Sequence, residues 1–332
     1  MFVTSISATE HLSEVEQRIT QQVVEELPAA YSLLEKAVNT NSGTMNFAGV
    51  KTVGMQFKQT LDNLGFETKW HDGEAFNRAG HLEATWLSQT SPNAPKLLLI
   101  GHLDTVFTKG DAFQSMKKLD GEMVAGPGIT DMKGGDVIIV TALKVLKEQG
   151  ALNDLNIKVV MTGDEEKSGR PLSLSKKVLI DAGKWADIAL GFEDGDSNIK
   201  TAVIARRGSS GWSMNVTGKA AHSSQIFTQA VGDGAIYEMA RILNEFREQL
   251  SNEHNLTFNP GVMLAGTTVE LDMASANGKA FGKDNVVAKV GIVKGDIRAV
   301  SLEQEAHTRK VMKTIASKNL LNTSATISFN EG

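Results

Sequence analysis

The sequence predicts an α/β fold, in which an open, largely parallel sheet with helices on both faces is followed by a smaller α+β unit. Up to Arg206, short apolar runs alternate with segments of helical periodicity, as in strand–helix–strand units. Beyond Arg206 the runs become amphipathic and their order changes. A chain of 332 residues has room for two domains, which we expect at residues 1–206 and 207–330.

The elements expected in the first domain follow from the spacing of its apolar residues. Two amphipathic helices come first, one near Leu12 that Pro28 kinks or restarts and one from Phe47 to Leu64. Gly65 favours a helix end at that point. The other expected elements are a strand at 66–70, a strand at 96–100, a helix at 134–149, a polar helix at 172–182, and buried strands at 157–161 and 187–192.

The second domain is expected to have the order β-α-β-β-α-β, that of a split βαβ sandwich. Its strands are predicted at 211–216, 256–265, 286–298 and 324–329, and its helices at 232–250 and 302–316. The segment 274–283 contains glycine and asparagine and is predicted to be a loop.

Composition excludes several classes of function. The net charge is −5 and the chain has no Lys/Arg run, which argues against nucleic acid and anionic membranes as partners. Its apolar stretches are too short to span a bilayer. Because the chain has no cysteine, any metal must be held by His, Asp and Glu. The first residues lack the features of a complete signal peptide, so a cytoplasmic location is expected, or a periplasmic or secreted one if a leader precedes them.

Acidic and imidazole side chains follow three of the expected strands. His102 and Asp104 follow the first, Glu165 and Glu166 the second, and Glu193 the third. Sites in open parallel sheets form outside the carboxyl ends of the strands, so these clusters are expected to meet. Asp131 lies just before the helix that starts near Gly134 and is expected to join them.

Each cluster alone also has a purely structural interpretation, as a surface pair, a helix N-terminus, an N-cap or a turn. Taken together they indicate a metal site. One His with several carboxylates suits a pair of divalent ions, Zn²⁺ or alternatively Co²⁺ or Mn²⁺. Asp104 can orient the imidazole of His102. Of Glu165 and Glu166, one can bind metal while the other accepts a proton from water.

Four motifs identify a family resemblance. In order and spacing, LLLIGHLDTVF, AGPGITDMKGG, VVMTGDEEKSG and IALGFEDG resemble those of the dinuclear-zinc aminoacylases and carboxypeptidases, and most of all the glutamate carboxypeptidases (carboxypeptidases G). RRGSSGWSMNVTGKAAHSS and NVVAKVGIVKGDIR resemble the lid-domain motifs of the same family. The resemblance covers about residues 50 to 330 and implies a catalytic domain followed by a lid or dimerisation domain.

The resemblance implies a role for each residue of the first domain. His102 and Glu193 would bind one metal ion, Asp131 would bridge two, and Glu166 would bind the second. Glu165 would be the general base and Asp104 the partner of His102. A cis peptide bond is expected between Asp131 and Met132.

The lid motifs add residues for substrate. By resemblance, His222 would reach the active site of a partner subunit and polarise the scissile carbonyl, in a homodimer formed through the lid. Asn285 and Arg298 would hold substrate, with Arg298 gripping a carboxylate. Taken alone, His222, Asn285 and Arg298 are more typical of a strand-end surface residue, a turn residue and a partner in an ion pair, respectively.

The family's chain continues beyond its lid into a segment with a further metal-binding His. This sequence ends at residue 332 without it, so we expect a truncated form, less stable than a chain extended through that segment.

We therefore expect a metal-dependent hydrolase of amide bonds, a carboxypeptidase that releases an amino acid such as glutamate from a small peptide or acylated amino acid. The alternatives are an N-acyl-amino-acid deacylase with the same machinery and a catalytically silent dimerising protein. A nucleotide-binding loop is disfavoured, because no Lys-Ser/Thr pair follows the glycines near residue 128.

Overall fold

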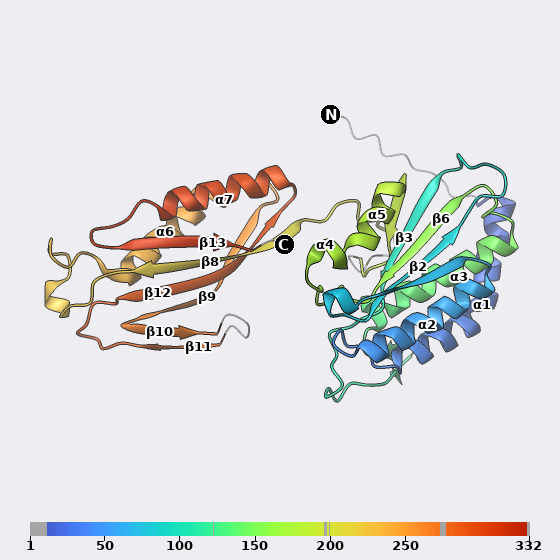
Figure 1. Cartoon of the computed structure of the whole chain (residues 1–332), viewed down its shortest axis with the longest axis horizontal. Coiled ribbons are helices and arrows are strands. Elements are labelled where there is room, and N and C mark those ends of the chain that lie inside the picture. The colour runs from blue at the N-terminus through green and yellow to red at the C-terminus, as the bar shows by residue number, and fades with distance from the viewer. Residues whose placement is uncertain (1–11, 122, 196–197, 199, 273–276, 331–332) are drawn as a thin grey trace. The chain divides into compact units, whose positions relative to one another are not determined.

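The computed structural model describes residues 12–121, 123–195, 198, 200–272 and 277–330. The chain divides into two compact units, residues 1–201 and 202–332 (Figure 1). Among the described residues, no helix combines the length and the apolar character that crossing a membrane requires.

The first unit is built on a five-stranded sheet of order β1-β2-β6-β3-β7. Its centre is parallel, because β3 pairs in parallel with both β6 and β7, while β1 and β2 are antiparallel additions at one edge. The strands are β1 (Glu67–Asp72), β2 (Gly80–Trp86), β3 (Lys96–His102), β6 (Asn156–Thr162) and β7 (Ile188–Gly191), and a separate small ribbon pairs β4 (Lys117–Lys118) with β5 (Val124–Ala125).

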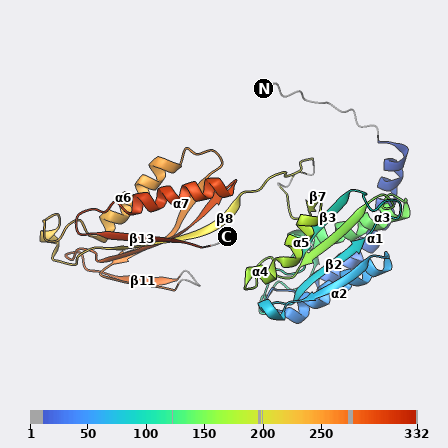
Figure 2. The same ribbon diagram turned by 45° about the horizontal axis from the view of Figure 1, so that its top comes forward.

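Helices cover both faces of this sheet, as expected (Figures 1 and 2). On one face α2 and α3 bury the main core, centred on side chains such as Phe57, Leu82 and Ile139, and α1 packs against α3. On the other face α5 packs on β3 and β6 around Leu98 and Val160. The helices are α1 (Glu14–Val38), α2 (Phe47–Asn63), α3 (Gly134–Glu148), α4 (Leu172–Ser175) and α5 (Lys177–Trp185).

The second unit is an antiparallel sheet of order β13-β8-β12-β9 with two helices packed on it. Its chain order matches the predicted β-α-β-β-α-β pattern, with a hairpin of β10 and β11 inserted after β9. The elements are β8 (Gly208–Thr217), α6 (Gly234–Leu250), β9 (Thr257–Gly266), β10 (Thr268–Leu271), β11 (Gly278–Phe281), β12 (Val290–Ala299), α7 (Leu302–Ala316) and β13 (Ser324–Phe329).

Pro28 lies inside the single helix α1, so the helix does not restart there. Two local predictions were wrong. The strand at 187–192 is not buried: all four residues of β7 are exposed, since β7 is an edge strand that α5 does not cover. Part of the expected loop at 274–283 is the strand β11, while residues 273–276 lie outside the described residues.

Candidate metal centre

The candidate site lies at the carboxyl ends of the three parallel strands of the first unit. His102 is the last residue of β3 and pairs in register with Thr162, the last residue of β6. Three residues beyond that point the chain reaches Glu165, and on the other side of β3 the chain leaves β7 at Gly191 and reaches Glu193. The parallel arrangement therefore brings together clusters that are distant in sequence.

Asp131 reaches the same place from a tight turn before α3. The turn η2 (Ile129–Lys133) follows Gly128, whose φ of +70° a side chain would disfavour. The Asp131–Met132 peptide bond is cis, as the sequence resemblance implied. Asp131 does not cap α3, because the N-cap position belongs to Lys133 and shows no side-chain cap.

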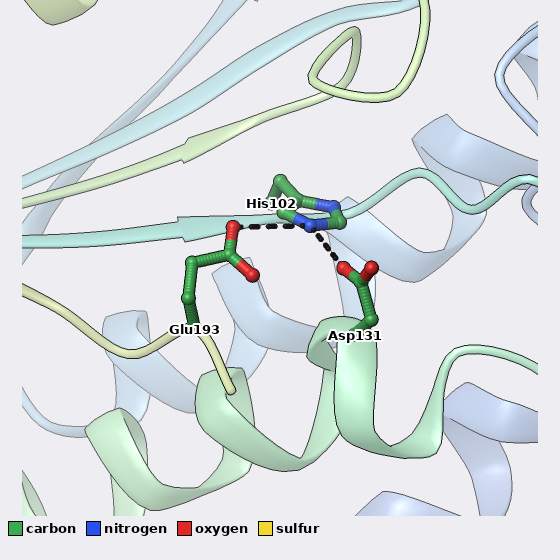
Figure 3. A group of neighbouring side chains, drawn as sticks. All are labelled: His102, Asp131 and Glu193. Carbon is green, nitrogen blue, oxygen red and sulfur yellow. Dashed lines mark hydrogen bonds and ion pairs between the residues drawn. The ribbon is translucent and has the colours of Figure 1, made fainter. Parts of the chain in front are cut away.

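His102 lies between two carboxylates (Figure 3). Its Nε2 atom is 2.9 Å from Oδ1 of Asp131 and 3.3 Å from Oε1 of Glu193. The three side chains can each offer one ligand atom, and these atoms lie within 4.8 Å of one another. The imidazole is buried whereas both carboxylates are open to solvent, so an ion could enter from the carboxylate side.

Asp104 is also buried in the site, although its contacts differ from those expected. The atom nearest to Nδ1 of His102 is the backbone carbonyl of Asp104, at 2.9 Å, while the nearer carboxylate oxygen is 3.6 Å away. The carboxylate accepts hydrogen bonds from Thr44 Oγ1 (2.7 Å) and from the backbone N–H groups of Glu165 (3.0 Å) and Glu166 (3.2 Å). The main-chain carbonyl of Asp104 thus orients the imidazole of His102, and its carboxylate holds the backbone of Glu165 and Glu166.

Glu166 faces the same space as Asp131. Both residues line a cavity of about 270 Å³, together with Gly128 and Val106. Glu166 also lines a larger neighbouring cavity of about 470 Å³, beside Met45 and Lys109. A second ion between Asp131 and Glu166 would therefore lie next to a space large enough for a small substrate group.

The electrostatics of the site fit a divalent cation. Burial lowers the pKa of His102, but the hydrogen bond to Glu193 and the charges of Asp104 and Asp136 outweigh it and raise that pKa to about 10. Burial and the negative charge of Asp131 raise the pKa of Glu166 to about 7. The pKa of His102 rises because carboxylates surround it, whereas that of Glu166 rises first because the side chain is partly buried and then because Asp131 is near. Imidazole and carboxylate without thiolate form a donor set that zinc accepts, and the residues present therefore fit the expected metal.

Two buried polar residues around this centre, Thr44 and Asp136, were not identified from the sequence. Thr44 carries no motif that could have identified it. Asp136 lies on α3, fully buried, and neither of its carboxylate oxygens has a hydrogen-bond partner among the described residues. A signal for Asp136 was available, because it is an acid that directly precedes an apolar run on the buried face of a predicted helix.

The expected substrate residues all lie in the second unit. His222 is exposed and caps the short helix η3 (Ser223–Gln225), with Nδ1 2.8 Å from Ser224 Oγ. Asn285 is its neighbour, because the carbonyl of Asn285 accepts a hydrogen bond from Ser223 N–H at 2.9 Å. Arg298 is an exposed residue of β12 that contacts Asp296 at 3.2 Å. His222 and Asn285 thus lie on neighbouring backbone segments, whereas Arg298 contacts Asp296.

Comparison of the sequence with known families and proteins agrees with this geometry. Residues 98–318 match the model of peptidase family M20/M25/M40. Carboxypeptidase G2 of Pseudomonas sp. (strain RS-16) is 30% identical over 256 residues, which are 77% of this chain and 60% of that protein. A probable succinyl-diaminopimelate desuccinylase of Staphylococcus aureus (strain MRSA252) is 31% identical over 207 residues, or 60% of this chain and 46% of the relative. The chain thus spans roughly half to three fifths of the length of these relatives.

Solved structures share the fold. The aminopeptidase PepT from Bacillus cereus superposes with a TM-score of 0.67 at 19% identity, covering 95% of this chain and 75% of that one. The YXEP protein of Bacillus subtilis, described as a dinuclear metal-binding peptidase from the M20 family, gives a TM-score of 0.57 at 12% identity, covering 94% of this chain and 74% of its own. With a family model matched over most of its length and a His/Asp/Glu metal-binding group at the strand ends, this chain belongs to peptidase family M20/M25/M40.

Proposed function

We propose that this chain binds two divalent metal ions, most simply Zn²⁺, and hydrolyses an amide bond to release a C-terminal amino acid such as glutamate. The observation that carries the proposal is the placement of His102 between the carboxylates of Asp131 and Glu193, at strand ends shared with Glu165 and Glu166. The similarity to carboxypeptidase G2 supports release of a C-terminal amino acid, and the resemblance of the motifs to glutamate carboxypeptidases is the reason for proposing glutamate. Small peptides and acylated amino acids are the corresponding substrates.

In this proposal the metal ligands divide between two positions. His102 and Glu193 would hold one ion and Glu166 the other, and Asp131, which lies 2.9 Å from His102 and lines a cavity with Glu166, would serve both. When bound, such ions supply a Lewis acid for the scissile carbonyl and make an attacking water more acidic. Asp104 fixes the orientation of His102 through its backbone carbonyl.

Glu165 is the proposed general base. Burial raises the pKa of its carboxyl group, and the charges of Glu193, Asp104 and Asp131 raise it further against the opposing effect of His102. A carboxylate of raised pKa is a stronger base at neutral pH. Glu165 therefore accepts a proton from the attacking water and later passes it to the nitrogen of the departing amine.

The second unit is proposed to complete the site as a lid and dimerisation domain. His222 would polarise the substrate carbonyl in a partner subunit, and Asn285 and Arg298 would bind the substrate. The exposed positions of all three residues are compatible with contacts to a substrate or a second subunit. Arg298 presents a planar guanidinium that matches a carboxylate in two parallel hydrogen bonds.

A Glu165→Gln variant tests the proposal directly. It keeps the size of the side chain and removes the base, so turnover of an acylated glutamate should fall by about 10²-fold or more. Zinc content, measured by mass spectrometry after dialysis, should stay at the wild-type value. Glu67→Gln, at an exposed position of β1, is the matched control and should leave both quantities unchanged. Wild-type-like turnover by Glu165→Gln would remove Glu165 as the base.

A second candidate, an N-acyl-amino-acid deacylase, is favoured by the identity to the probable succinyl-diaminopimelate desuccinylase. The two functions are separated by comparing kcat/KM for an acylated glutamate with kcat/KM for a succinylated diamino acid. If the zinc-loaded chain hydrolyses neither substrate, the catalytic proposal is wrong and a silent dimerising protein is the better description.

A further inference from the structure

The segment that carries Glu165 and Glu166 has little regular structure of its own. Between the end of β6 at Thr162 and the start of α4 at Leu172 it forms no helix or strand. Its two glutamates must nevertheless be placed accurately if they are to serve as base and ligand. On the side of the metal site, the carboxylate of Asp104 holds the N–H groups of Glu165 and Glu166.

On the opposite side the segment rests on His81 of β2. This imidazole is 1% exposed and stacks on Phe76, with ring centroids 5.2 Å apart and an interplanar angle of 10°. Gly163 N–H donates a hydrogen bond to Nδ1 of His81 at 3.2 Å. Nε2 lies 2.9 Å from the carbonyl oxygen of Ser175, the last residue of α4, which directly follows the segment. One ring therefore contacts both ends of the loop 163–175, which comprises the segment and α4.

These two partners select a single protonation state. An N–H donor at Gly163 requires an unprotonated Nδ1, and a carbonyl acceptor at Ser175 requires a protonated Nε2. Only the neutral ring with its proton on Nε2 satisfies both. Burial lowers the pKa of His81 and favours the neutral ring, as do the positive charges of Lys176 and His71, while Asp164 and the bond to Ser175 act in the opposite direction.

Close packing leaves the loop little room to move away from β2. A Cβ atom on Gly163 would lie 2.3 Å from the carbonyl oxygen of Gly80, and one on Gly169 would lie 2.6 Å from Phe76. Arg78 adds hydrogen bonds from Nε to the carbonyl of Lys167 (2.6 Å) and from Nη2 to that of Ser168 (2.9 Å).

Inside the loop, Asp164 joins its two ends. One oxygen of this buried carboxylate accepts hydrogen bonds from Gly169 N–H (2.8 Å) and Ser175 Oγ (2.6 Å), and the other is 3.1 Å from Nζ of Lys176. Ser175 thus donates a hydrogen bond from its hydroxyl to Asp164 and accepts one from Nε2 of His81 at its carbonyl oxygen. The loop is closed on itself by Asp164 and fastened to the sheet by His81.

We propose that His81 is a positioning residue for the proposed reaction: through its Nε2-protonated neutral ring it fastens the loop 163–175 to β2 and so sets the places of Glu165 and Glu166. Its consequence for catalysis rests on the proposed function, whereas the fastening itself does not. Because His81 contacts neither glutamate side chain in any described hydrogen bond, it acts through the backbone alone.

The test compares His81→Phe with His71→Phe in the metal-free chain. Phenylalanine keeps a flat ring against Phe76 and loses both hydrogen bonds. His71 is the matched control, because it lies opposite His81 on β1 and pairs with Glu83 rather than with the loop. We expect amide hydrogen exchange over residues 163–169 to rise about tenfold or more in His81→Phe only, with the rest of the first unit unchanged.

Two further measurements address catalysis and folding. In the zinc-loaded chain, His81→Phe should lower kcat about tenfold or more with KM changed less than about twofold, and should weaken binding of one zinc ion of two. His81→Asn, whose Oδ1 can replace Nδ1 as an acceptor, should recover part of the exchange protection. In the wild-type chain, the ¹⁵N shifts of the ring should report a proton on Nε2 alone at neutral pH.

The outcomes separate the two proposals. Unchanged exchange over 163–169, an increase spread over the whole first unit, or a ring protonated on Nδ1 would each overturn the fastening by His81. The ¹⁵N measurement decides this even if His81→Phe does not fold. Localised exchange without any hydrolysis by the wild-type chain would uphold the fastening and contradict the proposed function instead.

Discussion

His102 is surrounded by more negative charge than one imidazole can neutralise. Asp131 and Glu193 contact its Nε2, and Asp104 and Asp136 add their charges from the buried side. These carboxylates raise the pKa of His102 to about 10, and burial together with the charge of Asp131 raises that of Glu166 to about 7. A divalent ion must displace the protons that these two groups hold.

Zinc binding should therefore release a number of protons that depends on pH. At pH 6 both His102 and Glu166 are largely protonated, so about two protons should leave; at pH 8.5 Glu166 is already ionised and about one should leave, from His102. Because protons compete with the ion, zinc affinity should rise with pH across this range. Calorimetric titration in buffers of different ionisation enthalpy counts the protons.

Glu166→Gln supplies the control for that count. It should lower the release at pH 6 to about one proton and leave the release at pH 8.5 unchanged. An equal release at the two pH values in the wild-type chain would show that Glu166 is not protonated in the metal-free site.

At the same scale, the sequence could predict residues that carry a motif and could not predict those that act by packing. His102, Asp131 and Glu193 stand in short patterns at strand ends, and the structure brings them together. His81 is a single histidine in a strand that periodicity did not reveal, and its partners Gly163 and Ser175 contribute only backbone groups. Every residue type except proline has the same backbone N–H and C=O groups, so the sequence does not indicate which of them a side chain will contact, and only the structure identifies this contact.

At the scale of elements, close approaches of the backbone determine where the ligands lie. Helix α3 begins against the segment that carries Glu193: a Cβ on Gly135 would lie 2.1 Å from the carbonyl oxygen of Phe192. The glycine therefore allows Asp131, just before α3, and Glu193, just after Phe192, to approach the same imidazole. This contact explains Gly135, whereas a Cβ on Gly134 would lie 2.6 Å from the carbonyl oxygen of Ile129.

Gly135→Ala should consequently destabilise the protein and weaken zinc binding together. We expect a loss of about 1–3 kcal/mol in the free energy of unfolding, because backbone must move to admit the methyl group. The control is Gly183→Ala in α5, where no atom lies within 4 Å of the new Cβ and a gain of about 0.5–1 kcal/mol is expected from helix propensity. Chemical denaturation and zinc titration of both variants provide the test, and a Gly135→Ala protein with wild-type zinc affinity would contradict it.

The errors of the sequence analysis at this scale have one physical origin. β7 has the composition of an interior strand, yet Ile188 and Leu190 are exposed, because β7 is at the edge of the sheet and α5 packs on β3 and β6 instead. β2 was not predicted, although it lies between β1 and β6 in the sheet. Composition reports how well a segment would tolerate burial, whereas burial itself depends on which neighbours the topology supplies.

At the scale of the whole molecule, the metal-binding group and the proposed substrate residues belong to different compact units. His102, Asp131, Glu166 and Glu193 all lie within residues 1–201, and His222, Asn285 and Arg298 lie within residues 202–332. The sequence predicted two units of the observed types, because each has its own order of strands and helices. The sequence could not predict whether the two units act on one substrate, because hydrophobic periodicity indicates the elements within a unit and not the contacts between units.

Zinc should therefore stabilise the first unit alone. In scanning calorimetry we expect two transitions, and zinc should raise the midpoint temperature only of the one that belongs to residues 1–201. At a free zinc concentration of 100 times Kd, the free energy of unfolding of this unit should increase by about 2.7 kcal/mol. Hydrogen exchange of peptides from each unit assigns the transitions. His102→Asn should abolish the shift, and an equal shift of both transitions would refute independent stabilisation.

The pairing of β7 with β3 also affects how the first unit folds. β3 ends at residue 102 and β7 begins at residue 188, and the chain between them forms β4, β5, η2, α3, β6, α4 and α5, so this pair closes one of the longest loops in the unit. Glu193 follows β7, and the ligand set stays incomplete until that strand has docked. An ion then has little to bind in the folding transition state and stabilises mainly the finished structure, so it slows unfolding and leaves the folding rate nearly unchanged. Metal supply would thus control the lifetime of the native state instead of the speed of reaching it.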